Sequence, residues 1–243
     1  MRAIDALTRG EKTKLTRLAR DLVAWAAANG RDFPWRSEKA GTYERIVVEV
    51  LLQRTTAAAV AGLYERFFAT FPTWDALAAA TPGELEVFLK PLGLWRRRAQ
   101  ALLGLARYGA AAAGKFPRNP DDHAEIPAVG QYVSNAIMLF QHARNSPLLD
   151  VNMARVIERF VRPRRLADIR HDPWLQSAAK WFVRAEGAAE ANWAILDFAA
   201  LVCKARRPLC ETCPVRARCS YFRAGPSRPR MAPAPSSRAP VPS

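Results

Sequence analysis

Cysteine and acidic residues are scarce in this sequence, and long apolar runs are missing. Only four of the 243 residues are cysteine, and all four lie between positions 203 and 219. Nothing else marks the chain as a secreted disulfide scaffold. Because there is no run of 18 apolar residues, we expect no transmembrane helix and no membrane partner. The first residues also lack the apolar core of a signal peptide. Because the four cysteines indicate an oxygen-sensitive metal centre, we expect a cytoplasmic protein.

The shortage of acidic residues leaves the chain strongly basic. Lys and Arg number 37 and Asp and Glu number 22, which gives a formal net charge of +15. Such a surface attracts polyanions over long range, and the planar guanidinium of arginine suits phosphate oxygens. We therefore expect a nucleic-acid partner and a nucleoid-associated protein; a merely solvated basic surface is the alternative.

Apolar residues recur at helical spacing, and no segment alternates with the period of a β-strand. Leu15, Leu18 and Leu22 follow this spacing, and Gly30 lies just beyond the predicted end of their helix. Thr81 and Glu84 form the capping pattern of a helix start. Further helices are predicted for residues 43–58, 95–113, 132–141, 151–160, 173–185 and 190–202. The sequence therefore predicts an all-α protein.

The composition changes near the C-terminus. Residues 224–243 contain six prolines, three arginines and mostly small residues. Such a segment buries too little apolar surface to offset the entropy of ordering it. We predict a disordered, Pro-rich tail over residues 223–243.

The four cysteines, Cys203, Cys210, Cys213 and Cys219, are separated by six, two and five residues. One stretch of 17 residues thus supplies all four sulfurs, and it can surround a compact iron–sulfur cluster. Structural zinc usually takes two short Cys-x-x-Cys pairs, and only one occurs here. The spacing favours iron–sulfur, with zinc and two disulfides as alternatives.

A short turn separates two of the predicted helices at residues 126–131, which read Ile-Pro-Ala-Val-Gly-Gln. Backbone N–H groups at Val129, Gly130 and Gln131, together with the start of the next helix, can point at a phosphate. Taken alone, the turn fits a simple packing corner between helices equally well.

Five motifs occur in order along the chain: Arg-Asp-Phe-Pro-Trp-Arg at 31–36, Glu-Val-Leu-Leu-Gln-Arg-Thr-Thr-Ala at 49–57, the 126–131 turn, Leu-Asp-Val-Asn at 149–152, and the cysteine stretch. Together they resemble the helix-hairpin-helix DNA glycosylases that carry an iron–sulfur cluster, the superfamily of endonuclease III and MutY. The resemblance runs from about Leu15 to Phe222. It is closest to the archaeal mismatch-specific thymine-DNA glycosylases.

The resemblance implies a six-helix barrel with a helix-hairpin-helix motif, an iron–sulfur cluster domain, and a DNA-binding cleft between the two. We assign residues 1–36 to an N-terminal segment that packs with the cluster domain, 37–147 to the six-helix domain and 148–222 to the cluster domain. The implied cofactor is a [4Fe-4S] cluster on the four cysteines. The implied partner is double-stranded DNA with a mispaired or damaged base, bound by a monomer.

Members of this superfamily flip a base out of the duplex and break its bond to a sugar that becomes cationic. The resemblance places Asp150 beneath that sugar, with Asn152 orienting it, and Glu49 where it can protonate the base or position water. Asp150 can also serve as a plain helix cap, and Asn152 too can merely cap. Glu49 can be an ordinary surface glutamate, but residues 47, 48 and 50–52 around it are apolar.

Tyr132 stands where related enzymes with lyase activity place a lysine. A phenol cannot form a Schiff base, so we expect a monofunctional enzyme that leaves the abasic site uncut, with lyase activity absent or weak. Tyr132 would then lie against the sugar or base, unless it is simply a core aromatic residue.

The resemblance also assigns residues that contact DNA. Gln53 would enter the gap left by the flipped base, and Leu94 and Trp95 would form a second wedge. Arg206 and Arg207, between cluster cysteines, would hold phosphates.

The identity of the excised base rests on fewer residues. Ala57 matches the thymine branch, whereas Trp193 replaces the leucine of that branch and the glutamine of the adenine enzymes. Ala128 stands where the family prefers glycine. The leading hypothesis is removal of thymine or uracil opposite guanine. The alternatives are removal of adenine opposite guanine or 8-oxoguanine, removal of another modified base, a non-catalytic DNA-binding protein, and a bifunctional lyase.

Overall fold

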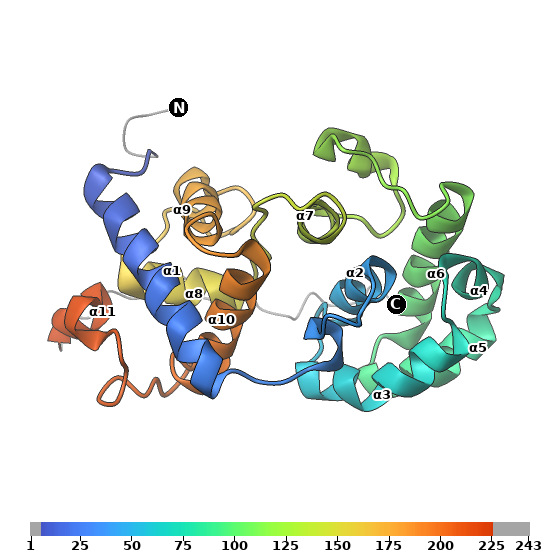
Figure 1. Cartoon of the computed structure of the whole chain (residues 1–243), viewed down its shortest axis with the longest axis horizontal. Coiled ribbons are helices and arrows are strands. Elements are labelled where there is room, and N and C mark those ends of the chain that lie inside the picture. The colour runs from blue at the N-terminus through green and yellow to red at the C-terminus, as the bar shows by residue number, and fades with distance from the viewer. Residues whose placement is uncertain (1–5, 226–243) are drawn as a thin grey trace, which may run out of the picture. The chain divides into compact units, whose positions relative to one another are not determined.

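The computed structural model describes residues 6–225, and every regular element within them is a helix (Figure 1). The predicted all-α fold is confirmed. Most of the predicted tail, residues 226–243, lies outside the described residues. No helix in the described part is long and apolar enough to cross a membrane.

The chain divides into two compact units. The first combines Met1–Arg31 with Asn145–Ser243, and the second is Asp32–Arg144. The four-part division made from the sequence, which assigns functions to the parts, stays a prediction.

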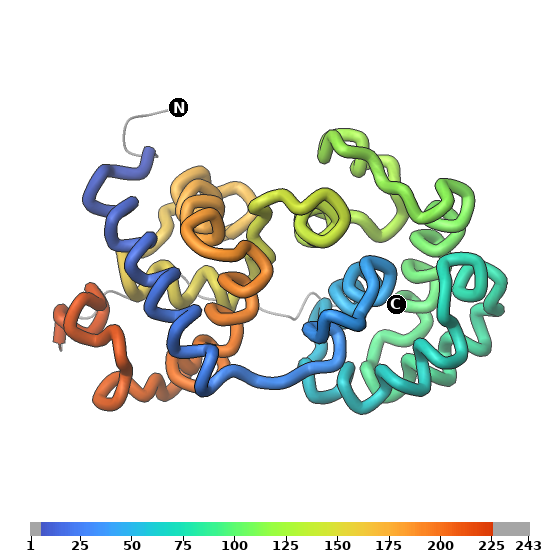
Figure 2. Tube along the Cα trace, viewed as in Figure 1, coloured from blue at the N-terminus to red at the C-terminus, as the bar shows by residue number. Residues whose placement is uncertain are grey.

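The first unit contains α1 (Arg9–Asn29), α8 (Val151–Phe160), α9 (Pro173–Val183), α10 (Ala188–Leu201), the 3-10 turn η5 (Arg216–Arg218) and α11 (Ser220–Arg223). Helix α1 packs against α9 and α10, and Figure 2 shows α1 running beside α10 although more than 150 residues separate them in the sequence. The predicted stripe of Leu15, Leu18 and Leu22 is fully buried in this unit. Burial of this stripe fixes the first helix onto the C-terminal half of the chain.

Local chemistry sets both ends of α1. Thr8 and Glu11 form a capping box at its start, and Gly30 follows its end as the sequence predicts. Beyond Gly30, Arg31 makes an ion pair of 2.8 Å with the buried carboxylate of Asp197 on α10. Arg31 therefore anchors the end of the first segment of this unit.

The second unit contains the 3-10 turns η2 (Pro34–Arg36), η3 (Lys90–Leu92) and η4 (Pro120–Glu125), and the helices α2 (Thr42–Leu51), α3 (Ala57–Thr70), α4 (Trp74–Ala79), α5 (Pro82–Leu89), α6 (Trp95–Ala111) and α7 (Gln131–Phe140). Helix α6 packs against α4 and α5, and α2 packs against α7. The capping box predicted at Thr81 is present. In the 31–36 motif, Phe33 stacks on Trp35 at 4.6 Å, and both are core residues. This motif therefore serves packing.

One predicted helix is wrong in its extent. The apolar spacing predicted a single helix over residues 43–58, but α2 ends at Leu51 and α3 begins at Ala57. Between them Arg54 has a left-handed backbone (φ 56°), and the Thr56 side chain accepts a hydrogen bond from Ala59 N. Threonine at this position starts a new helix, because its hydroxyl satisfies an N–H group that has no partner in the helix.

The helix-hairpin-helix turn packs closely on α6. A Cβ atom added to Gly104 would come within 2.7 Å of the Pro127 Cβ, so only glycine fits beneath the turn. Val129 N donates to Ile126 O at 3.1 Å and closes the turn. The turn is thereby held on the body of the second unit, directly before α7.

Candidate active site and metal centre

In the first unit, Asp150 is the N-cap of α8, and its carboxylate is held by three hydrogen bonds. Oδ1 accepts from Asn152 N (2.9 Å) and Met153 N (2.8 Å), and Oδ2 accepts from the Asn152 side chain (2.6 Å). Burial raises the pKa of the Asp150 carboxyl, whereas these donors and Arg155 lower it. The expected cap is therefore present, and the same bonds fix the position of the carboxylate.

Asn152 is itself oriented by a residue that the sequence did not reveal. Arg155 Nη1 donates to Asn152 Oδ1 (3.0 Å), so the amide nitrogen of Asn152 must face Asp150. The Arg155 guanidinium is fixed in turn by Ala199 O (3.0 Å) and by the backbone carbonyl of Cys203 (2.9 Å). A chain of hydrogen bonds thus joins the first predicted cluster ligand to the Asp150 carboxylate.

In the second unit, Glu49 on α2 lies against Tyr132 on α7. Glu49 is buried, with 3% of its surface exposed, and the Tyr132 hydroxyl donates to Glu49 Oε2 at 2.7 Å. Glu49 is therefore not a surface glutamate. Tyr132 packs on the core and carries its hydroxyl to this carboxylate. That it lies against the sugar or base stays a prediction.

The helix-hairpin-helix turn presents backbone at the start of α7. Val129 is buried, while Gly130 and Gln131 are exposed, and the N-cap residue Gly130 has no side chain to cap the helix. N–H groups at such an end favour an anion. Ala128 has a left-handed backbone (φ 66°), which explains why a glycine suits this position.

The predicted DNA wedges lie on two loops of the second unit. Gln53 is exposed in the turn after α2, and Leu94, 57% exposed with φ 51°, immediately precedes α6. Trp95 differs: it begins α6, is half-buried and packs on the core. Of the predicted pair, Leu94 is the side chain that stands out from the surface.

Ala57 and Trp193 are the two residues from which the sequence predicts the identity of the base. Ala57 is half-buried at the first position of α3. Trp193 is half-buried in the middle of α10 in the first unit, and its indole nitrogen is shielded from solvent.

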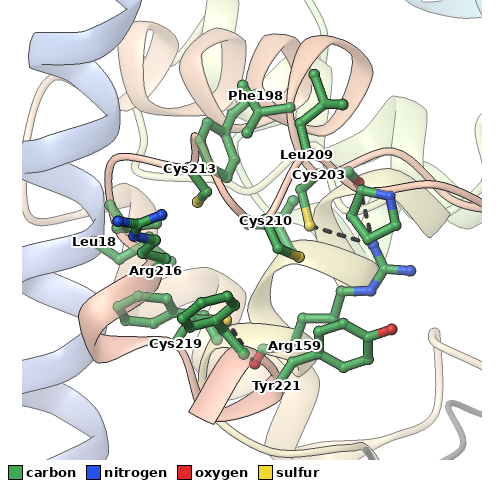
Figure 3. Close-up of a pocket in the computed structure, with 16 residues that line it drawn as sticks. Leu18, Arg159, Phe198, Cys203, Leu209, Cys210, Cys213, Arg216, Cys219 and Tyr221 are labelled. Carbon is green, nitrogen blue, oxygen red and sulfur yellow. Dashed lines mark hydrogen bonds between the residues drawn. The ribbon is translucent and has the colours of Figure 1, made fainter. Parts of the chain in front are cut away.

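The four cysteines lie around one cavity in the first unit. Their side chains face the same space in Figure 3, and apolar residues of α8 and α10 complete its walls. Cys203 follows α10, and Cys219 precedes α11. All four are free cysteines, so the disulfide alternative is wrong. Within residues 6–225, no group of three or more His, Cys, Asp or Glu side chains is arranged to bind a single metal ion.

The chemistry of this cavity fits an iron–sulfur cluster. Burial, and to a lesser degree the three neighbouring cysteines, raise the pKa of Cys213 to about 11. Closely placed thiolates of this kind need cationic iron to stay deprotonated. Arg159 braces the loop, because it donates to Lys204 O (2.7 Å) and Ala205 O (2.9 Å) and lies 3.5 Å from the Cys203 sulfur. Four sulfurs, an apolar wall and a nearby guanidinium suit an anionic cluster.

The arginines of the cysteine loop divide into two groups. Arg206 and Arg207 are exposed. Arg218 instead pairs with Asp21 on α1, and Arg216 donates to Glu211 O. Arg218 and the likewise exposed Arg216 hold the loop, whereas Arg206 and Arg207 are accessible to solvent.

Two family models match the chain. One, described as HhH-GPD superfamily base excision DNA repair protein, covers residues 47–169. The other, described as the iron-sulfur binding domain of endonuclease III, covers residues 203–219. The second match includes all four cysteines, and the prediction of a [4Fe-4S] cofactor is confirmed.

Relatives agree with this assignment. A thymine-DNA glycosylase of Aeropyrum pernix is 35% identical over 87% of this chain and 97% of the relative. A thymine/uracil-DNA glycosylase of Methanothermobacter thermautotrophicus is 32% identical over 79% of this chain and 87% of the relative. The solved structure of a thermostable thymine-DNA glycosylase superimposes with a TM-score of 0.75 at 28% identity, covering 87% of this chain and 97% of the other.

The predicted family and enzyme class are confirmed. The chain belongs to the HhH-GPD superfamily of base excision DNA repair proteins, as a DNA-binding glycosylase with an iron–sulfur domain like that of endonuclease III.

Proposed function

We propose that the protein excises thymine or uracil opposite guanine from double-stranded DNA and leaves the abasic site uncut. The proposal that the abasic site stays uncut rests on one hydrogen bond: the Tyr132 hydroxyl donates to Glu49 Oε2 at 2.7 Å. A lyase needs an amine there to attack the sugar, and a phenol bound to a carboxylate offers none.

Asp150 would stabilise the sugar as the base departs. Its carboxylate is the only full negative charge in its hydrogen-bond set, and three donors hold it in one position. A cationic sugar about 4 Å away would be attracted by about 4 kcal/mol at an effective dielectric near 20. This attraction develops only as the bond breaks, so it accelerates the reaction instead of tightening the binding of intact DNA.

Glu49 would act on the base or on the attacking water. Tyr132 donates to Oε2, so that oxygen serves as an acceptor, and a proton that Glu49 delivers must reside on Oε1. Burial keeps this carboxyl away from bulk water. To act as a general acid it must lie within hydrogen-bond reach of the extruded base. In the ionised state the same oxygen can instead accept a proton from water.

The [4Fe-4S] cluster, held by the four cysteines, would supply a fixed structural centre. The loop around it presents Arg206 and Arg207 to phosphates, and the turn at Gly130 would bind a second phosphate through its backbone. We propose that a monomer in the cytoplasm binds DNA in this way.

The base preference follows the relatives, two of which are named for thymine or thymine and uracil. Ala57 agrees with that branch. Trp193 departs from it, since an indole occupies more volume than the leucine found there. Because of this departure, the test also includes duplexes in which adenine is the target base.

The test is a set of duplexes, each with a single T:G, U:G, A:G or A:8-oxoguanine pair, analysed with and without alkali. We expect strand breaks only after alkali, and only for T:G and U:G. Breaks without alkali would contradict the monofunctional assignment. Preferential loss of adenine would replace the proposed substrate. No excision from any of the four duplexes would refute the proposed substrate in favour of another modified base or a non-catalytic DNA-binding protein.

A further inference from the structure

Arg98 is buried near the start of α6, between the two loops that carry Gln53 and Leu94. Its Nε donates to Gly93 O (3.0 Å) and its Nη1 to Leu51 O (3.2 Å). Its Nη2 donates to Gln53 O (2.6 Å) and to the Thr55 hydroxyl (2.6 Å). One guanidinium thus bonds to both loops at once.

Both loops contain residues in a left-handed backbone conformation, which surrounding contacts must stabilise. Arg54 (φ 56°) and Leu94 (φ 51°) are left-handed without being glycine, and Gly93 (φ 71°) precedes Leu94. A left-handed conformation costs an L-residue about 1–2 kcal/mol, so it persists only where the surroundings impose it. Arg98 touches the loops directly beside these positions.

The acceptors are also electrostatically suited to a cation. The carbonyls of Leu51 and Gln53 lie at the C-terminal end of α2, where carbonyl groups lack helical partners and carry partial negative charge. Arginine reaches acceptors in several directions, because its five N–H groups form a planar fork. Lysine presents three donors on a single atom and cannot serve both loops in the same way.

We propose that Arg98 is a positioning residue that fixes Gln53 and Leu94 as one rigid pair, so that the two side chains enter the duplex together when the target base leaves. This inference rests on the proposed function. Arg98 touches neither Glu49 nor Tyr132 through any bond described above, so its loss should slow base extrusion and leave the bond-breaking step unchanged.

The test compares Arg98→Lys and Arg98→Met with Arg107→Met, an exposed arginine further along the same helix. Two substrates contain the same T:G pair, one in a fully paired duplex and one inside a three-base bubble, where much of the unstacking is already done. For the paired duplex we expect the Arg98 variants to excise roughly 10- to 100-fold more slowly than wild type, since displacement of positioning groups by about 1 Å costs this much. In the bubble the deficit should shrink to about threefold or less. Equal deficits on both substrates would overturn the proposal.

A second comparison places Arg98→Lys in a protein that already has Gln53→Ala and Leu94→Ala. If Arg98 acts through these two side chains, the lysine should then change the excision rate by less than about twofold. An undiminished effect would show that Arg98 acts elsewhere.

A third measurement does not depend on the substrate. Hydrogen exchange should show that Arg98→Lys deprotects the amides of residues 52–56 and 93–97 together, while α1 and α10 keep their protection. Deprotection of one loop alone, or of neither, would overturn the proposal. If wild-type protein excises no base from any of the four duplexes, the proposed function fails, and the exchange measurement still decides whether Arg98 joins the loops.

Discussion

Replacing Asp150 with asparagine removes the proposed catalytic charge while leaving much of the cap intact. The new Oδ1 can still accept from Asn152 N and Met153 N. The new amide group, however, would face the Asn152 side-chain nitrogen, where the carboxylate now accepts a bond of 2.6 Å. Loss of that one bond costs about 1 kcal/mol of folding stability, a small effect beside the catalytic one.

The catalytic effect follows from the lost charge. An attraction of about 4 kcal/mol between charges 4 Å apart corresponds to roughly a thousandfold in rate. We therefore expect single-turnover excision from a T:G duplex to fall by about a thousandfold, with the affinity for the same duplex, measured by fluorescence anisotropy, unchanged.

Asp172 provides a matched control. It is the buried N-cap of α9 in the same unit, and it accepts from Leu175 N (2.7 Å), Arg165 N (2.8 Å) and Leu166 N (3.0 Å). Asp172→Asn should lower the free energy of unfolding by about 1–3 kcal/mol and leave excision by the folded protein unchanged. The reasoning is refuted if Asp150→Asn loses binding and excision equally, or if both variants lose the same amount of excision.

Three further predictions concern the same machinery. Burial raises the pKa of Asp150 above its ordinary value of 3.8. Only the ionised carboxylate attracts a cation, so excision should be lost as the pH falls through a midpoint above 3.8. A pH–rate profile without this loss at acidic pH would count against the assignment. Arg155→Met frees the side chain of Asn152 and should slow excision by roughly 10- to 100-fold at unchanged affinity for DNA. In a protein that already has Asn152→Ala, the same substitution should slow excision little further. A full effect in that protein would argue against the hydrogen-bond chain from Arg155 through Asn152 to Asp150. Ala128→Gly relieves left-handed strain and should raise the free energy of unfolding by about 0.5–1 kcal/mol in urea titrations, and a lower value would disprove the strain argument.

The sequence predicts best those features that depend on only a few adjacent residues. Thr81 with Glu84, and Gly30 after an apolar helix, give capping signals that depend on a few adjacent residues, and both ends are as predicted. The cysteine spacing was equally direct, because it reports ligands within one short loop. Asp150 was interpretable as a cap for the same reason.

The positioning residues could not be predicted in this way. Arg98 and Arg155 lie in helices, where the sequence makes an arginine resemble a solvent-facing residue. Their partners are mostly backbone carbonyls more than 40 residues away, and a carbonyl carries no sequence signal. The sequence does not predict the break between α2 and α3 for a related reason. Apolar spacing continues across the break, whereas the left-handed backbone of Arg54 depends on tertiary contacts.

The most direct test of the central claim, that the Asp150 carboxylate stabilises a cationic sugar, is the affinity for duplexes with an analogue in place of the target nucleotide. One duplex contains a cationic azasugar and the other the uncharged tetrahydrofuran of the same shape. Wild-type protein should bind the cationic duplex more tightly by roughly a hundred- to a thousandfold, and Asp150→Asn should lose most of this preference. Equal preference in the two proteins would contradict the account.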